Sequence, residues 1–196
     1  ANQNSFGKAV LPHYHFDKAD VIMSFGADFL GTWISPVEFT SQYVQNRNNK
    51  SLQSKKMSRH IQFETGMSLT GSNADVRIPV KPSEEGVALV NLYNQISGTT
   101  LPGTRKLNNA NADKALTIVA KELQAAKGKA LVISGSNDVA TQVLVNAINS
   151  ALGSYGTTID LDNYSNQYAG NDHDFTEFVK EMNNGEVGAV LFLNAN

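Results

Sequence analysis

The sequence predicts an α/β fold in which helices cover both faces of a mainly parallel sheet. Along most of the 196 residues, short apolar runs alternate with segments of helical periodicity, which is typical of such sheets. Helix-capping residues also stand where the helical segments begin and end. Together these two observations predict a Rossmann-like arrangement with right-handed crossovers.

The apolar runs place the strands. We predict strands at residues 20–25, 59–64, 75–80, 130–134, 157–161 and 188–193. Pro79 has no backbone N–H to donate to a neighbouring strand, so its segment is expected at an edge of the sheet.

The amphipathic segments place the helices. They are predicted at residues 36–45, 83–98, 113–127, 138–152 and 175–183. Ser35 and Pro36 suit the N-cap and first position of the first helix, and Asp138 is expected to cap the fourth. Trp33, the only tryptophan, is expected to anchor the first helix against the sheet.

Composition limits the function. The chain is 41% hydrophobic and 17% charged, with a net charge of −2, so nothing in its charge favours nucleic acid as a partner. No apolar run approaches the roughly 20 residues that span a bilayer. Cysteine is absent, which excludes disulfides, thiolate nucleophiles and cysteine-ligated metal centres from this segment.

The chain is expected to be one α/β domain taken from a longer polypeptide, because it begins without methionine and stops just after the apolar run 189–193. A loop near residues 99–111 divides it into possible sub-halves, 1–98 and 112–196.

Binding sites in parallel sheets lie beyond the carboxyl ends of the strands, which here are followed by residues 26–33, 64–75 and 135–139. The first of these loops has small residues where a ligand could approach the backbone, but it matches neither a dinucleotide fingerprint nor a phosphate-binding lysine motif. On spacing alone, a tight turn whose glycines permit the backbone path is the favoured explanation of this loop. No hydrolase motif occurs.

Three other groups of polar residues have structural explanations. Residues 134–138 are expected to cap a helix, and so are the acids and histidine at 171–174. His13 and His15 are interpreted as surface or packing residues.

Three stretches resemble molybdopterin oxidoreductases of the dimethyl sulfoxide reductase superfamily. Residues 19–29 (ADVIMSFGADF) are similar to the first strand and turn of that family. Residues 59–64 (RHIQFE), continuing to 78–83 (IPVKPS), are similar to its second strand and cofactor loop, and residues 178–196 to a later glycine-containing passage.

A narrower resemblance joins residues 24–39 (SFGADFLGTWISPVEF) and 67–75 (MSLTGSNAD) to the large periplasmic subunit family of bacterial alternative complex III. That complex is a quinol:cytochrome c oxidoreductase. The resemblance implies a domain without molybdenum cofactor, iron–sulfur clusters elsewhere in the parent protein, a periplasmic location, and partners among the other subunits and domains of a membrane-bound respiratory complex.

The resemblance also implies a vestigial pocket. Cofactor-binding members place an Asp-Pro-Arg-like triplet after the second strand, where this chain has residues 64–66 (ETG). The pocket residues expected from the family are Gly26, Ala27, Asp28, Gly31, Glu64, Thr65, Thr70 and Asp75. We expect the 64–75 loop to lie beside residues 26–31, and Met67, Phe29 or Trp33 to fill the space.

Two alternatives stay open. One is a genuine cofactor-binding domain of a molybdopterin-dependent sulfur-compound reductase, which would hold molybdopterin guanine dinucleotide. The other is a free-standing nucleotide-binding Rossmann-like module.

Overall fold

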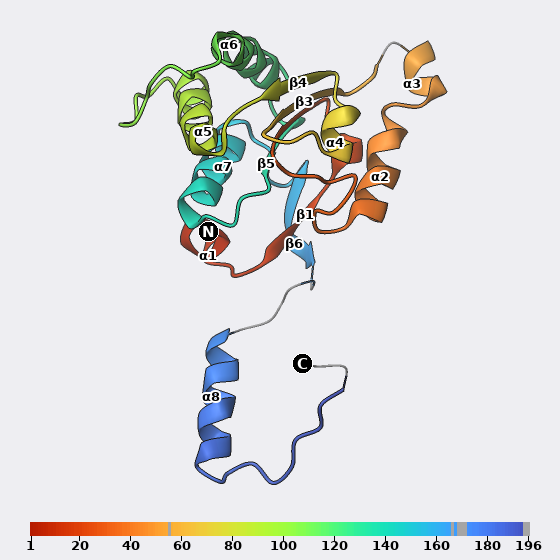
Figure 1. The fold of residues 1–196 in the computed structure, drawn as a ribbon. Coiled ribbons are helices and arrows are strands. Elements are labelled where there is room, and N and C mark those ends of the chain that lie inside the picture. Colours follow the sequence, from red (N-terminus) through yellow and green to blue (C-terminus); the bar gives the residue numbers. More distant parts are fainter. Residues whose placement is uncertain (55, 166, 168–171, 194–196) are drawn as a thin grey trace. The chain divides into compact units, whose positions relative to one another are not determined.

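The computed structural model describes residues 1–54, 56–165, 167 and 172–193 (Figure 1). The chain divides into two compact units, Ala1–Ser165 and Asn166–Asn196. The first unit contains both sheets and most of the helices. The second contains helix α8 (Asp172–Asn183); the capping expected of residues 171–174 falls partly on residue 171, outside the described residues.

The central sheet confirms the predicted fold class. Its four strands are all parallel and lie in the order β4-β3-β2-β5. Their bounds are Val21–Phe25 for β2, Arg59–Glu64 for β3, Val76–Pro79 for β4 and Ala130–Ser134 for β5. The strand that contains Pro79 lies at an edge, as its missing N–H predicts.

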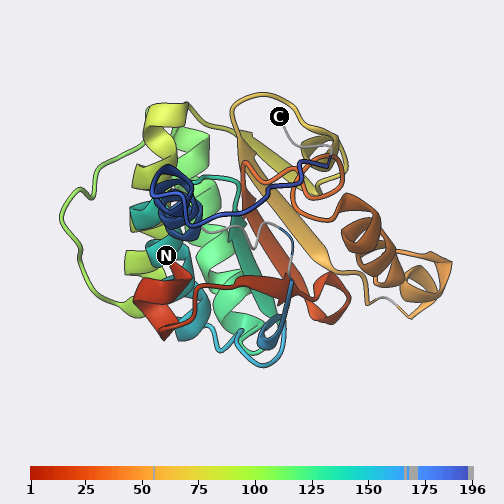
Figure 2. The same cartoon turned by 90° about the horizontal axis from the view of Figure 1, so that it is seen from below.

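Helices cover both faces of this sheet (Figure 2). Alternate residues of β2 point to opposite sides, as the two-residue period of a strand requires. Met23 and Phe25 belong to one apolar core and Ile22 to the other. The first core packs under α5 (Pro82–Ser97), α6 (Ala110–Ala125) and α7 (Val139–Ala151).

The second core lies under α2 (Pro36–Gln45), which contributes Phe39 and Tyr43. Trp33 packs its ring against Phe39 and against Tyr14. The predicted anchoring of the first helix by Trp33 is therefore confirmed. The remaining short elements are α1 (Asn2–Phe6), β1 (Leu11–Tyr14), η1 (Phe16–Lys18), α3 (Asn49–Gln53) and α4 (Leu69–Ser72).

The expectation of a parallel strand at 157–161 is wrong in its pairing. Strand β6 (Ile159–Ser165) pairs antiparallel with β1 in a separate two-stranded sheet. The hydroxyls of Ser154 and Thr158 donate to the Ala130 carbonyl at 2.8 and 2.7 Å. These bonds hold the chain at the amino end of β5, from where it continues onto β1.

The expectation of a last strand at 188–193 is also wrong. These residues adopt no strand, and Leu191 and Leu193 are 97% and 87% exposed. A strand needs a neighbouring strand to take its backbone hydrogen bonds. The described residues of Asn166–Asn196 contain no strand that could serve as this neighbour.

Candidate functional site at the carboxyl edge of the sheet

Two loops meet where β2 and β3 end. Residues 26–35 follow β2, and residues 65–68 with α4 follow β3. The backbone N–H and hydroxyl of Thr70 donate to Oδ1 of Asp28 at 3.0 and 2.8 Å, and the Thr70 hydroxyl accepts from the N–H of Leu30 at 2.9 Å. The expectation that the 64–75 loop lies beside residues 26–31 is confirmed at these contacts.

Asp28 organises a tight turn. Its carbonyl oxygen accepts from the N–H groups of Gly31, Thr32 and Trp33 at 2.8 to 3.0 Å. A Cβ on Gly31 would lie 2.2 Å from Oδ2 of Asp28, a distance that no side chain tolerates. Glycine at position 31 is therefore explained by the approach of the Asp28 side chain.

Glu64 is the most enclosed carboxylate at this edge, with 4% of the residue exposed. Its Oε1 accepts from the N–H of Ser68 at 3.2 Å and from Nε of Arg77 at 2.5 Å. Its Oε2 accepts from the Ser68 hydroxyl at 2.6 Å and from Nε2 of Gln62 at 3.2 Å. Burial alone would raise the pKa of Glu64, but these hydrogen bonds together lower it below its usual value.

Gly71 completes the enclosure of Glu64. A Cβ at Gly71 would stand 1.8 Å from Oε1 of Glu64, so α4 can approach the carboxylate only because residue 71 has no side chain. The hydroxyl of Ser68 also caps α4 by accepting from the Gly71 N–H at 2.9 Å. Next along the chain from Glu64, the Thr65 hydroxyl donates to the Val80 carbonyl at 3.0 Å.

The carboxyl ends of β2 and β5, the topological switch point of the sheet, are in backbone contact. Gly26 has a positive φ of 64°, and a Cβ on Gly135 would lie 2.6 Å from the Gly26 carbonyl oxygen. Ala27, which follows Gly26, is fully buried. Nearby, Glu85 accepts from the Ser134 hydroxyl at 3.2 Å, and burial raises the pKa of Glu85.

A line of buried polar side chains runs along β3. His60, Gln62 and Glu64 occupy alternate positions and are 0%, 0% and 4% exposed. The Tyr43 hydroxyl lies 3.1 Å from Nδ1 of His60, whose Nε2 lies 3.4 Å from Oε1 of Gln62. Gln62 donates its amide N–H to Glu64, so its oxygen faces Nε2 of His60, and the Tyr43 hydroxyl also donates to the Asn73 carbonyl at 3.2 Å. Burial lowers the pKa of His60 to about 4.

Asp75 lies at the other end of this line. It precedes β4, so it stands at the amino edge of the sheet, apart from the seven other expected pocket residues. Arg47 donates to both of its carboxylate oxygens at 2.7 and 2.9 Å, and the His60 N–H donates to it at 2.7 Å. Burial would raise the pKa of Asp75, but these bonds lower it overall. The Arg47 guanidinium also stands 4.9 Å from the centre of the Tyr43 ring.

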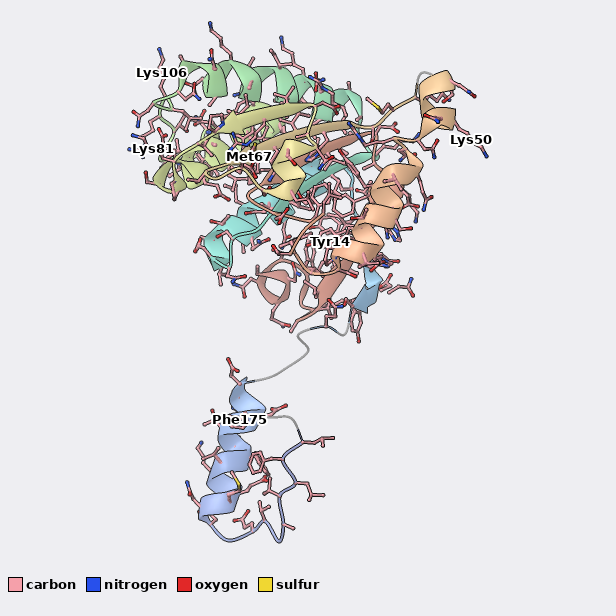
Figure 3. All side chains as sticks on the ribbon, turned by 45° about the vertical axis from the view of Figure 1, so that its right-hand side comes forward. Tyr14, Lys50, Met67, Lys81, Lys106 and Phe175 are labelled. Carbon is pink, nitrogen blue, oxygen red and sulfur yellow. The ribbon has the colours of Figure 1, made fainter. Side chains whose placement is uncertain are left out.

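Polar groups, not large apolar ones, fill this edge. Met67, named as an occupant, is 72% exposed (Figure 3). Phe29 is fully buried in the core below, stacked on Phe16 at 4.3 Å. Trp33 packs on the α2 side, as described above. The expectation that bulky apolar side chains occupy the cleft is therefore wrong for Met67, and the hydrogen bonds of Asp28, Glu64 and Thr70 take that place.

The cation beside Glu64 was missed by sequence reasoning, which looked for it directly after the second strand. Arg77 comes instead from β4, where it is the register partner of Gln62. Side chains of register partners in parallel strands point to the same face. The register of β3 and β4 therefore places Arg77 beside Glu64. The spacing of these residues along the chain does not show this contact.

No metal centre is evident among the described residues, since no group of three or more His, Asp or Glu side chains is arranged to hold an ion. Nε2 of His13 lies within hydrogen-bond distance of Oε1 of Glu38, at 2.5 Å, and the His13 ring lies 4.6 Å from that of His15. In the same described ranges, no helix combines the length and the apolar character that crossing a membrane requires.

Comparison with models of known protein families gave no match, and comparison with curated proteins gave none either.

Proposed function

We propose that this chain is a non-catalytic scaffold domain of an oxidoreductase subunit that resembles molybdopterin enzymes. Its parent assembly is a bacterial quinol:cytochrome c oxidoreductase, on the periplasmic side of the membrane. The other subunits and the remaining domains of the same polypeptide are its partners, and they carry the iron–sulfur clusters.

The enclosure of Glu64 carries this proposal. A carboxylate that binds guanine has to accept hydrogen bonds from the N–H groups of the base. Each carboxylate oxygen of Glu64 already accepts two hydrogen bonds from the chain. One of these four bonds comes from Arg77 and ends on Oε1. A nucleotide would have to displace these donors and leave the Arg77 charge without its partner. The residues at this edge therefore do not fit the guanine end of molybdopterin guanine dinucleotide.

The second support is the contact between the β2 and β5 loops. Ligands of open parallel sheets enter the crevice at the switch point, but Gly26 and Gly135 approach so closely there that not even a Cβ fits between them. The edge of the sheet is built as a packed surface. A packed surface suits a domain that supports neighbouring domains in a larger assembly.

Isolation of the assembly that contains this chain tests the proposal. A tag on the parent polypeptide should bring down membrane-embedded and haem-containing subunits, and the isolate should oxidise quinol with reduction of cytochrome c. Elemental analysis should find iron but no molybdenum. Stoichiometric molybdenum with an extractable pterin would contradict the proposal, and so would recovery of the polypeptide without other subunits.

A further inference from the structure

His13 and His15 form a histidine pair on the small sheet. His13 belongs to β1, and His15 follows this strand with its backbone N–H still donating to the Thr158 carbonyl, at 2.9 Å. Residues two apart in an extended chain point to the same side. The two imidazole rings accordingly lie together, with their centres 4.6 Å apart, while Tyr14 between them packs against the second apolar core. The pair shares no residue with the carboxyl-edge site.

A carboxylate determines which nitrogen of His13 carries the proton. Nε2 of His13 lies 2.5 Å from Oε1 of Glu38, in the first turn of α2. An ionised carboxylate only accepts hydrogen bonds, so Nε2 is the donor, and Nδ1 of the neutral ring carries the lone pair. Histidines that bind metal ions have this arrangement, in which one nitrogen donates to a carboxylate or carbonyl and the other binds the ion.

A second carboxylate faces His15. Oδ1 of Asp17 lies 3.9 Å from Nδ1 of His15, and this oxygen is buried without a hydrogen-bond partner among the described residues. A small rotation of the ring lets the Nδ1–H group donate to Oδ1, which satisfies the buried oxygen and leaves the lone pair on Nε2. Burial lowers the pKa of His15, so its ring is neutral at pH 7, the form that binds metal ions.

Two neutral imidazoles suit a late first-row divalent ion. Imidazole nitrogen binds Zn²⁺, Ni²⁺ and Cu²⁺, and Cu²⁺ binds most tightly of the three. Structural and catalytic zinc sites use three or four protein ligands, so a site with two histidines leaves its other positions to water. The side chains of His13 and His15 are 32% and 17% exposed, which gives an ion access from solvent.

We propose that His13 and His15 form a binding site for a divalent copper, nickel or zinc ion. Nδ1 of His13 and Nε2 of His15 bind the ion, and water molecules take the remaining positions. Glu38 and Asp17 orient the two rings through their other nitrogens. The site is independent of the carboxyl edge of the central sheet and of the function proposed for it.

Pulsed EPR of the full chain with equimolar Cu²⁺ tests this site, because the spectrum counts the imidazoles that bind the ion. The parent chain should show two imidazoles, and H13Q and H15Q should each show fewer. Each of these two substitutions should also weaken Cu²⁺ binding about tenfold or more in a calorimetric titration. The chain has no cysteine, so no thiolate competes for the ion.

Two further variants separate binding from positioning. H173Q removes an exposed histidine of α8, and it should keep both imidazole signals and an affinity within about twofold of the parent. E38Q retains both ligands but removes the carboxylate that orients His13, so it should keep two imidazoles and weaken binding about tenfold. Circular dichroism of each variant checks that the fold is retained.

Three results would overturn the proposal: fewer than two imidazoles on Cu²⁺ in the parent chain, folded H13Q and H15Q variants that bind Cu²⁺ as tightly as the parent does, or an equal loss of binding in H173Q.

Discussion

A Cβ atom on Gly71 would lie 1.8 Å from Oε1 of Glu64. Helix α4 and strand β3 are therefore packed against each other through a carboxylate, with no space between them. Glu64 is at once the residue that the family resemblance points to as a nucleotide ligand and the residue that closes the edge of the sheet.

Replacing Gly71 by alanine should destabilise the fold by about 2 kcal/mol or more, because the added methyl group displaces the Glu64 carboxylate from its donors. Gly66 is the matched control, since nothing lies within 4 Å of its added Cβ, and G66A should stay within about 0.5 kcal/mol of the parent. Urea unfolding measures both. Equal effects of the two substitutions would show that Glu64 is not confined by α4.

Replacing Arg77 by methionine should destabilise the fold by about 3 kcal/mol at pH 7, because it leaves the buried Glu64 charge without its cation. R59M is the control. Arg59 pairs with Glu122 at 3.4 Å with both side chains partly exposed, so its loss should cost less than about 1 kcal/mol.

The double variant E64Q/R77M should recover part of the stability that R77M loses, since no buried charge then remains. Stability measured by chemical unfolding for the two single variants and the double variant gives the coupling energy. A coupling energy near zero would contradict the ion pair.

His60 should make the fold sensitive to acid. Its pKa is about 4 in the folded chain and about 6.5 when unfolded. Because the pKa of His60 is lower in the folded chain, neutral His60 makes its full contribution to the free energy of unfolding above pH 6.5. This contribution is lost as the pH falls toward 4. The difference between the two pKa values corresponds to about 3 kcal/mol.

Unfolding free energies of the parent chain and of H60Q, measured from pH 7 to pH 4, isolate this contribution. H60Q should show a much flatter profile between pH 6.5 and 4, while H173Q, which alters an exposed histidine, should follow the parent. Parallel profiles for parent and H60Q would contradict the burial of a neutral His60.

Lysine should not replace Arg47. Arg47 donates to both oxygens of Asp75 and to the Ser58 carbonyl, which a single ammonium cannot reproduce. R47K should cost about 1–2 kcal/mol in thermal or chemical unfolding, and R59K, at an exposed pair, should be near neutral. An unchanged free energy of unfolding in R47K would show that the paired hydrogen bonds from the guanidinium to Asp75 contribute no stability.

Strands β2 and β5 could be predicted from sequence because each is a short, largely apolar run. Strands β3 and β4 could be predicted because apolar and polar residues alternate along them. The missing backbone N–H of Pro79 also predicted correctly that its strand lies at an edge of the sheet. Strand β1 was missed because its four residues include Pro12 and His13 and show no apolar run. Strand β6 pairs antiparallel with β1, and a partner strand that was itself missed could not be expected from the sequence.

At the carboxyl edge, the sequence placed the 64–75 loop beside residues 26–31 correctly, because loops after neighbouring parallel strands share one edge. The family resemblance grouped Asp75 with these residues, which is wrong. Because the strands are parallel, strand β4, which follows Asp75, starts at the opposite end of the sheet from Glu64. Register also brings Arg77 to Glu64.

Titration of the full chain with guanosine diphosphate, followed by calorimetry, tests the closed edge most directly. A guanine-binding domain of proven activity serves as the positive control in the same buffer. The closure of Glu64 by Ser68, Gln62 and Arg77 predicts no heat of binding up to millimolar nucleotide. A dissociation constant tighter than about 10 μM, which corresponds to roughly 7 kcal/mol, would contradict the account.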